Sequence, residues 1–438
     1  MTKVSFTTLG CRLNQAESDS MAEELGDQGL VQAADSDPDI VVVNTCTVTR
    51  EATKASRSAI RRAVKNNPDA RVVVIGCYAV SNPEEVRSIE GVDAVFDNND
   101  KERIVEALAG NASTAPLLQI GMRNAKQPSS PSINRTTRSV QVRANLKVQT
   151  GCDEWCTFCI IPTTRGPLRS MHDRDLIAEA ERKVGAGARE LVLTGVHLGK
   201  YSYDRGGDER RLVSLLERLL AIEGVARLRL SSIFPRHLTP ELLELMASDR
   251  RMCRYLHVPL QAGDDGVLRE MHRPYDVEEY RAAVTRAHEF IDGLALATDI
   301  IVGFPGETDE AFENTLRLVQ ELRFSKLHVF RYSARPDTPA AAMSAQIDPQ
   351  IKKARSKRLI DLGNKLRREF LQDHLGRPLE ILVEDRREVD GRMVCSGQTD
   401  DYVRVWWEGE GQLGSLVQVE GTAIRADGLQ GSSTIVRA

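Results

Sequence analysis

The chain has 438 residues, 41% of them hydrophobic, and a formal net charge of −4 at pH 7. This length suits two to four domains, and the composition excludes fibrous and disordered classes. No run approaches the roughly 18 apolar residues of a membrane span, and residues 1–10 do not have the pattern of a signal peptide. We therefore expect a cytoplasmic protein with no membrane partner. Six of the eight cysteines fall just past expected strands, where thiols serve as metal ligands more readily than as disulfides, and Cys395 is expected to be a packing residue.

The first hundred residues alternate between apolar runs and helical patterns. This rhythm is typical of a parallel sheet with helices on its faces. The expected strands cover residues 4–9, 40–44 and 71–75, and the expected helices cover residues 15–25, 51–65 and 83–89.

Cys11, Cys46 and Cys77 each follow one of these three strands. Loops at the carboxyl edge of a parallel sheet converge, so three residues far apart in sequence can meet there. Single cysteines at strand ends are commonly just buried small residues. Three cysteines at three strand ends favour shared ligation, and we hypothesise an iron-sulfur cluster with one open iron.

The helix expected over residues 51–65 carries a basic stripe with little acid to neutralise it. Such a stripe is usually a solvated face. Its position directly after the Cys46 loop keeps contact with nucleic acid as a rival interpretation, with Arg57, Arg61 and Lys65 as the candidate RNA contacts.

Residues 111–138 turn to Asn, Ser, Thr, Pro and Gln, a composition typical of a linker. Six further strands alternate with helical stretches and predict an open or partial (β/α)6 barrel, whose reactive site lies where the strands end. These strands are expected at residues 145–150, 190–196, 227–233, 255–260, 296–304 and 326–332.

Cys152, Cys156 and Cys159 stand in a CxxxCxxC pattern just after the first of these strands. Three thiolates at this spacing can hold three irons of a four-iron cluster and leave the fourth iron open. S-adenosylmethionine fits that vacancy, because its amino and carboxylate groups can chelate the iron. A structural zinc site with Cys253 is the alternative, but zinc ligands usually come as CxxC pairs, and Cys253 is better explained as a buried thiol.

Other strand ends in the barrel point to the same rim. Thr194 and Gly195, Ser232, and Gln261 lie there, although turn chemistry alone would explain each of them. His257 is expected to be a hydrogen-bonded rim residue and not a metal ligand, because the cysteines already satisfy the clusters.

From residue 376 onward, short β-like runs predict a small antiparallel barrel. Residues 377–438 contain seven arginines and no lysine against eleven acidic residues, which is not the basic footprint of an RNA-binding surface. Tyr402, Trp406 and Trp407 could stack on bases, but aromatic residues in strands this short usually form the core.

The chain resembles the methylthiotransferase branch of the radical S-adenosylmethionine enzymes over nearly its whole length. The matching segments are TLGCRLNQAES, VVNTCTVT, VIGCYA, GCDEWCTFCIIP, TRGPLRS, YLHVPLQAGDD, DIIVGFPGETDEAFENT and HVFRYSARPDTPAA. The resemblance implies two 4Fe-4S clusters: a radical-generating one on Cys152, Cys156 and Cys159, and an auxiliary one that carries the inserted sulfur, on Cys11, Cys46 and Cys77. It also places five residues around S-adenosylmethionine, namely Phe158, Thr194, Gly195, Ser232 and Gln261.

Domain boundaries follow from the same resemblance. It implies an N-terminal methylthiotransferase domain at residues 1–110, a radical S-adenosylmethionine domain at residues 139–375 and a TRAM-like barrel at residues 376–438. A monomer served by an electron donor of flavodoxin or ferredoxin type is expected.

The segments GCRLNQAES and LTGVHL most resemble the group that acts on threonylcarbamoyl-adenosine in tRNA. This resemblance implies methylthiolation of adenine C2 beside the anticodon through an adenosyl radical, with no side chain assigned as acid or base. The alternatives are the same chemistry on a ribosomal-protein aspartate, which the acidic C-terminal segment favours, or on an isopentenyl-type adenosine. An RNA-binding iron-sulfur protein without catalysis is the non-enzymatic alternative.

Overall fold

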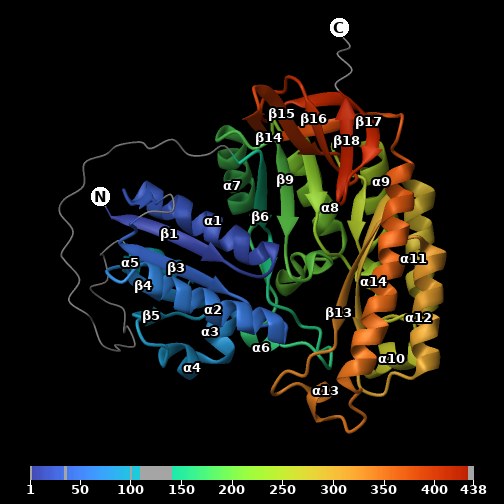
Figure 1. Ribbon diagram of the computed structural model, residues 1–438, viewed down its shortest axis with the longest axis horizontal. Helices are drawn as coiled ribbons and strands as arrows, with labels where there is room; N and C mark the ends of the chain where they lie inside the picture. Colours follow the sequence, from blue (N-terminus) through green and yellow to red (C-terminus); the bar gives the residue numbers. More distant parts are fainter. Residues whose placement is uncertain (1, 34–36, 99–100, 109–140, 433–438) are drawn as a thin grey trace. The chain divides into compact units, whose positions relative to one another are not determined.

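The computed structural model describes residues 2–33, 37–98, 101–108 and 141–432 (Figure 1). The expected linker at residues 111–138 lies outside the described residues. The chain divides into two compact units. The N-terminal unit comprises Met1–Ser139, Thr150–Trp155 and Cys159–Leu168, and the large unit comprises Val140–Gln149, Cys156–Phe158 and Arg169–Ala438.

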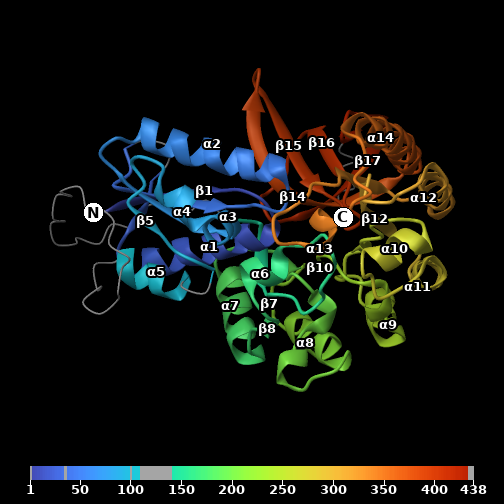
Figure 2. The ribbon, with the colours of Figure 1, turned by 90° about the horizontal axis from the view of Figure 1, so that it is seen from below.

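The N-terminal unit contains a five-stranded parallel sheet in the order β2-β1-β3-β4-β5. Helices α1 and α5 lie on one face and α2 lies on the other (Figure 2). The strands are β1 (Lys3–Thr8), β2 (Val31–Gln32), β3 (Ile40–Thr45), β4 (Arg71–Gly76) and β5 (Ala94–Val95); the helices are α1 (Arg12–Asp27), α2 (Arg50–Asn66), α3 (Cys77–Ser81), α4 (Pro83–Arg87) and α5 (Lys101–Leu108). The expected alternation of strands and helices is confirmed.

Alternation along β3 supplies both apolar layers of this sheet. Val42 packs with residues of α1 and α5, including Leu25, whereas Val41 and Val43 pack with residues of α2, including Ile60. Successive side chains of a strand point to opposite faces, so a strand covered on both sides is apolar throughout.

In the large unit, six parallel strands with helices around them form a partial barrel. They make two three-stranded sheets in the orders β10-β9-β6 and β11-β12-β13. Isolated bridges, Leu228 to Met252 and Ser232 to His257, join the two sheets. The strands are β6 (Arg143–Lys147), β9 (Glu190–Thr194), β10 (Arg227–Leu230), β11 (Tyr255–His257), β12 (Ala295–Val302) and β13 (Lys326–Arg331).

Helices follow these strands and bury their apolar faces against them in one continuous core. They are α7 (Asp173–Gly185), α8 (Arg210–Leu220), α9 (Pro240–Ser248), α10 (Asp265–Glu270), α11 (Val277–Phe290), α12 (Asp309–Leu322), α13 (Pro339–Ala342) and α14 (Pro349–Gln372). Among the described residues, no helix has the length and apolarity needed to cross a membrane.

The first barrel strand is shorter than the sequence predicts. β6 ends at Lys147, and β7 (Gln149–Thr150) lies outside both three-stranded sheets. Gly151 then turns the chain with φ +73°, and a Cβ at this position would lie 1.8 Å from the carbonyl oxygen of Pro167. Only glycine permits this close approach of two backbone segments, so the cysteine loop begins with a sharp turn.

The C-terminal residues close a five-stranded barrel in the order β14-β15-β16-β18-β17. Trp407 and Cys395 are fully buried in its core. Tyr402 and Trp406 are only half-buried, so the core expected of the three aromatic residues is confirmed for Trp407 alone. The β16–β18 pair is parallel, which departs from the antiparallel prediction, because β18 folds back on β17 and closes the barrel against β16. The strands are β14 (Pro378–Val389), β15 (Arg392–Gln398), β16 (Arg404–Glu408), β17 (Leu416–Ile424) and β18 (Gly428–Ser432).

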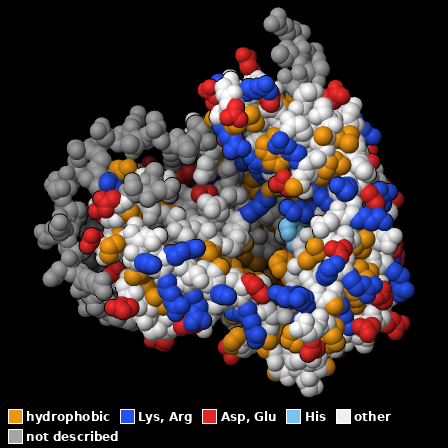
Figure 3. Space-filling view, viewed as in Figure 1, with side chains coloured by type: hydrophobic (Ala, Val, Ile, Leu, Met, Phe, Trp, Pro, Cys, Tyr) orange, Lys and Arg blue, Asp and Glu red, His pale blue; other side chains and the backbone are white. Residues whose placement is uncertain are grey.

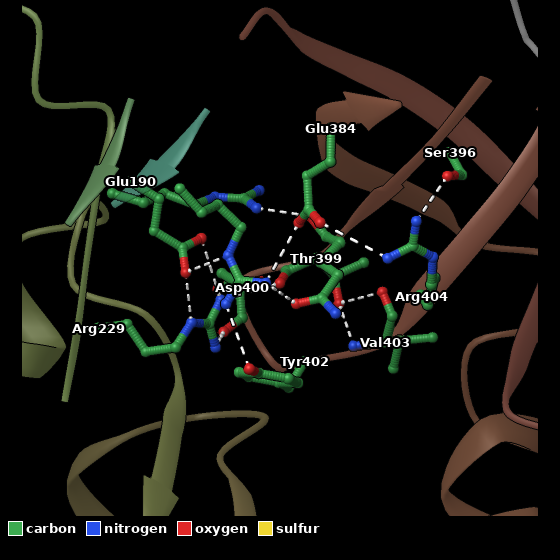
Figure 4. A network of polar contacts seen from close by, with 12 residues as sticks. Glu190, Arg229, Glu384, Ser396, Thr399, Asp400, Tyr402, Val403 and Arg404 are labelled. Carbon is green, nitrogen blue, oxygen red and sulfur yellow. Dashed lines mark hydrogen bonds and ion pairs between the residues drawn. The ribbon is translucent and has the colours of Figure 1, made fainter. Parts of the chain in front are cut away.

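A buried ionic network joins this barrel to the amino ends of the parallel strands (Figure 4). Glu190 Oε1 accepts hydrogen bonds from Arg229 Nε at 2.7 Å and Arg143 Nε at 2.9 Å. Arg229 also donates to the carbonyl oxygen of Asp400 at 2.8 Å, and Arg143 donates to the Tyr402 hydroxyl at 3.2 Å. Burial raises the pKa of Glu190, but the two arginines outweigh it and hold the pKa at about 2.

Candidate metal centres

The three N-terminal cysteines lie at the carboxyl ends of adjacent strands. Cys46 and Cys77 directly follow β3 and β4, and Cys11 precedes α1 as its N-cap residue. Burial raises the pKa of the Cys46 thiol to about 11, and the nearby Cys77 and Cys11 thiols add to the shift. The structure thus brings the three predicted ligands within electrostatic range of one another.

Gly10 leaves space beside these thiols. Its φ is +91°, and a Cβ there would lie 2.6 Å from Cys46 Cβ and 2.8 Å from Cys46 Sγ. The Asn14 side chain donates to the carbonyl oxygens of Leu9 at 2.7 Å and Thr45 at 3.0 Å. These contacts fix the two cysteine-bearing loops against each other, with room next to the sulfur of Cys46.

Arg165 places a buried positive charge beside this cysteine group. Only 1% of the residue is exposed. Its guanidinium donates to Glu17 Oε1 at 3.0 Å, Asn14 Oδ1 at 2.5 Å and Thr150 Oγ1 at 3.2 Å. Burial lowers the pKa of Arg165, but Glu17 and the Cys77 and Cys11 thiols outweigh it and raise the pKa.

Sequence reasoning did not single out Arg165. The family resemblance marks the segment TRGPLRS but gives no role to Arg165 within it. The partner of Arg165, Glu17, is 148 residues away in the sequence. Nothing in the local pattern marks either residue as buried.

The same segment carries part of the second cysteine group. Cys152 and Cys159 belong to the N-terminal unit, and the helix α6 (Ile161–Arg165) follows Cys159 directly. Asn98 donates to the carbonyl oxygen of Thr164 at 2.7 Å and lies 3.8 Å from Cys77 Sγ. One asparagine therefore contacts both the auxiliary cysteine group and the segment after Cys159.

Each sulfur of the CxxxCxxC loop accepts a hydrogen bond. Cys152 Sγ accepts one from the Glu154 amide at 3.4 Å, and Cys159 Sγ accepts one from the Ile161 amide at 3.5 Å. Within the large unit, Arg273 donates to Cys156 Sγ at 3.3 Å. Hydrogen bonds to ligating sulfurs stabilise the thiolate and tune the reduction potential of a cluster.

Arg273 is a second residue that sequence reasoning missed. Burial lowers its pKa, but Tyr275 and Cys156 raise it by a larger amount. Its guanidinium lies 4.2 Å from the centroid of the Phe234 ring. Arg273 is therefore held as a cation by aromatic stacking and by the thiol that it contacts.

The predicted S-adenosylmethionine residues of the large unit occupy different environments. Phe158 packs edge-on against Phe304, with ring centroids 6.5 Å apart. A Cβ at Gly195 would lie 3.0 Å from Gln149 Oε1, so this strand end has little spare room. Thr194 is 2% exposed and its hydroxyl donates to the Val192 carbonyl oxygen at 3.2 Å, so its side chain serves the strand itself.

Ser232 and Gln261 lie just after β10 and β11, and each contacts a neighbouring strand. Ser232 Oγ shares a hydrogen bond of 2.6 Å with His257 Nδ1. Gln261 has φ +68°, and its amide donates to the Asp299 carbonyl oxygen at 2.8 Å. A non-glycine residue in this region is strained, and such strain is often concentrated at ligand sites.

The candidate RNA contacts lie on α2. Arg57, Arg61 and Lys65 are exposed, and Lys and Arg side chains gather over this helix in Figure 3. Arg57 pairs with Glu85 at 3.0 Å, so the stripe is more neutralised than the sequence alone indicated.

A parallel α/β unit, a partial barrel and a cysteine triplet after the first barrel strand together define a radical S-adenosylmethionine enzyme. Two family models agree: the Radical SAM superfamily matches residues 146–319, and the uncharacterized protein family UPF0004 matches residues 3–97. The superfamily implies a 4Fe-4S cluster and S-adenosylmethionine.

The relatives of this chain indicate which group of radical S-adenosylmethionine enzymes it belongs to. The threonylcarbamoyladenosine tRNA methylthiotransferase MtaB of Bacillus subtilis is 37% identical over 96% of this chain and 94% of its own length. Its namesake in Aquifex aeolicus is 34% identical over 95% of this chain and 99% of its own. The tRNA-2-methylthio-N6-dimethylallyladenosine synthase of Pelotomaculum thermopropionicum is 33% identical over 98% of this chain and 97% of its own length. The chain belongs to the radical S-adenosylmethionine methylthiotransferase family.

A solved structure shows a similar fold. The radical S-adenosylmethionine methyltransferase TsrM from Kitasatospora setae, with cobalamin and a [4Fe-4S] cluster bound, superposes with a TM-score of 0.56. The match covers 78% of this chain and 77% of that chain at 17% identity.

Proposed function

We propose that the protein methylthiolates C2 of N6-threonylcarbamoyladenosine next to the anticodon of tRNA. The names of its relatives favour a tRNA substrate. The structural observation that carries the proposal is the gathering of Cys11, Cys46 and Cys77 around a space bordered by Gly10, with the buried charge of Arg165 beside it.

The donor sets suit the groups that this chemistry requires. Cys152, Cys156 and Cys159 would hold the radical-generating 4Fe-4S cluster, and the N-terminal triplet, Cys11, Cys46 and Cys77, would hold a second one. With S-adenosylmethionine bound, these groups supply abstraction of the C2 hydrogen and the methylthio group that replaces it.

The protein residues prepare these sites. The thiols of the N-terminal triplet become thiolates on ligation, and Arg165 offsets part of their negative charge at a buried position. Phe158, Ser232 and Gln261 would border S-adenosylmethionine at the rim of the barrel, where exclusion of water protects a radical.

The proposed function also requires a surface that binds tRNA and a partner that supplies electrons. Arg61 and Lys65 on α2 would contact RNA phosphates, as the basic surface in Figure 3 suggests. The C-terminal barrel would serve as a TRAM-like module from residue 376 onward, and an electron donor of flavodoxin or ferredoxin type would reduce the protein.

Nucleoside analysis tests the proposal directly. In tRNA from cells without this protein, mass spectrometry should show threonylcarbamoyladenosine that lacks its methylthio group. Unchanged tRNA together with an unmodified ribosomal-protein aspartate would refute it.

Iron analysis tests the second cluster. The reconstituted protein should hold about eight irons, and a variant with Cys11, Cys46 and Cys77 all changed to Ala should hold about four and still cleave S-adenosylmethionine. About four irons in the unchanged protein would exclude the second site.

A second candidate substrate is an isopentenyl-type adenosine, because relatives with that activity in their names are nearly as similar as the others. The same nucleoside analysis separates the two, since each substrate gives a methylthio product of different mass.

A further inference from the structure

The end of helix α10 is attached to the middle of the cysteine loop within the large unit. The Thr157 amide donates to the carbonyl oxygen of Met271 at 3.1 Å, and the Thr157 hydroxyl donates to the carbonyl oxygen of Glu270 at 2.8 Å. Cys156, which directly precedes Thr157, is only 7% exposed. These contacts bring the segment after α10 against the central cysteine of the CxxxCxxC pattern.

Arg273 extends from this segment to Cys156. Two of its three guanidinium nitrogens have partners: Nη1 donates to Cys156 Sγ at 3.3 Å, and Nε donates to the Tyr275 hydroxyl at 3.0 Å. The third nitrogen, Nη2, is buried and has no hydrogen-bond partner among the described residues. A buried donor without a partner is costly, so Arg273 has a donor in reserve for one more acceptor beside Cys156.

The positive charge of Arg273 has no carboxylate counter-ion in the part of the chain that the structure describes. Aromatic rings surround it instead. The guanidinium carbon lies 4.2 Å from the centroid of the Phe234 ring and 4.9 Å from that of the Tyr275 ring. Stacking on aromatic rings stabilises a cation but does not cancel its charge. Since arginine keeps its proton in proteins, this buried charge requires an anion.

Other buried arginines of the chain do have such an anion. Three of them lie within 3.0 Å of a glutamate oxygen, and in each pair both side chains are less than one-tenth exposed. The pairs are Arg165 with Glu17, Arg229 with Glu190 and Arg355 with Glu307. Arg273 differs from these three arginines because the acceptor that it contacts is the sulfur of an expected cluster ligand.

We propose that Arg273 is the counter-ion of the radical-generating cluster and raises the reduction potential of that cluster. The inference rests on the proposed ligation of the cluster by Cys152, Cys156 and Cys159. Ligation turns these thiols into thiolates, which supply the negative charge that Arg273 lacks. Reduction adds one more negative charge, so a buried cation that contacts a ligand stabilises the reduced form more than the oxidised form.

A raised potential affects two electron transfers in opposite directions. It favours reduction of the cluster by a flavodoxin or ferredoxin type of donor, and it lowers the driving force for passing the electron on to S-adenosylmethionine. Arg273 therefore acts as a positioning residue that sets the balance between the two transfers through Cys156.

Redox titration followed by electron paramagnetic resonance tests this inference. The reconstituted full-length protein would have Cys11, Cys46 and Cys77 changed to Ala, so that only the radical-generating cluster contributes a signal. In this protein, Arg273→Gln should make the equilibrium constant for reduction about tenfold smaller, because hydrogen bonds to charged groups are worth about that factor or more. For a one-electron couple, this change lowers the potential by about 59 mV. Arg273→Lys, which keeps the charge, should keep most of the potential.

The matched control is Arg227→Gln in the same protein. Arg227 is also a buried arginine of the large unit, with 1% exposure, but it donates to the carbonyl oxygens of Gln398 and Glu380. Its removal should leave the reduction potential unchanged.

Equal potentials for the parent protein and Arg273→Gln would overturn the inference. An equal fall for Arg273→Lys and Arg273→Gln would overturn it too, because the charge would then not be the cause. A raised KM for S-adenosylmethionine at an unchanged potential would assign Arg273 to that ligand instead.

Iron content decides the case in which Arg273→Gln does not hold a cluster. Parental iron content and potential in Arg273→Lys would then support the inference, and loss of iron from both variants would overturn it by indicating a structural role. The proposed function fails on different evidence, namely the nucleoside analysis of tRNA, so the two failures are distinguishable.

Discussion

The buried ion pair between Glu17 and Arg165 should be a main support of the N-terminal unit. The two side chains are 4% and 1% exposed, and their charged atoms lie 3.0 Å apart. Glu17→Gln keeps the size of the side chain but leaves the Arg165 charge without its counter-ion. Removing one partner of a buried pair typically costs about 3–5 kcal/mol.

The lower end of this range applies here, because Arg165 keeps its hydrogen bonds to Asn14 and Thr150. A loss of about 3 kcal/mol should lower the melting temperature of the N-terminal unit by about 6–12 °C. Scanning calorimetry of the cluster-free protein would measure the shift. Hydrogen exchange in α1 would show that the loss falls in this unit.

The control is Glu84→Gln, which removes an exposed ion pair to Arg87. Surface pairs contribute at most about 1 kcal/mol, so its melting temperature should fall by no more than about 4 °C. Adding Arg165→Met to Glu17→Gln should destabilise the protein less than the sum of the single changes, since the double variant has no unpaired buried charge. If Glu17→Gln lowers the melting temperature no more than Glu84→Gln does, the pair of Glu17 and Arg165 does not stabilise this unit.

Three further predictions concern other parts of the molecule. Gly10→Ala places a methyl group 2.8 Å from Cys46 Sγ, so iron bound after reconstitution should fall from about eight to about four, measured by metal analysis. In cluster-free protein at pH 8, iodoacetamide should label exposed Cys11 well before Cys46, whose pKa burial raises to about 11; peptide mass spectrometry should show Cys46 labelling increase toward pH 10. Burial lowers the pKa of His374, but its 2.6 Å contact with Asp401 outweighs burial and raises the pKa above 6.5. The pair therefore stabilises the folded protein fully below pH 6.5, and this stabilisation is lost as the pH rises through the raised pKa of His374. The deficit in melting temperature of His374→Gln should accordingly be larger at pH 5.5 than at pH 9, and an equal deficit at both would contradict the assignment.

Local pattern was enough to place the N-terminal cysteines. Cys11, Cys46 and Cys77 follow three apolar strands. Because the carboxyl ends of parallel strands converge at one edge of a sheet, this pattern predicts that the three cysteines lie close together. The same reasoning could not find Arg165, because a buried arginine is recognisable only through its partner, and Glu17 lies far away in the sequence. The parallel closure of β18 on β16 likewise depends on contacts that no short window contains.

The barrel strands show a similar division. Their number and order along the chain could be predicted from periodicity, whereas the early end at Lys147 depends on the turn that Gly151 makes against Pro167. His257 was correctly expected to be hydrogen-bonded, but its association with His328 required the register of β12 and β13. Register is a tertiary property, because it depends on which residues of two separate segments lie opposite each other.

The division of the cysteine loop between the two units limits how such proteins can be recombined. Thr150–Trp155 and Cys159–Leu168 fold with the N-terminal unit although they follow a barrel strand. A chimera with a crossover near residue 140 would join one parent's Glu17 and Asn98 to the other parent's Arg165 and Thr164. Chimeras of related enzymes should fold more often when residues 150–168 and the first hundred residues come from the same parent.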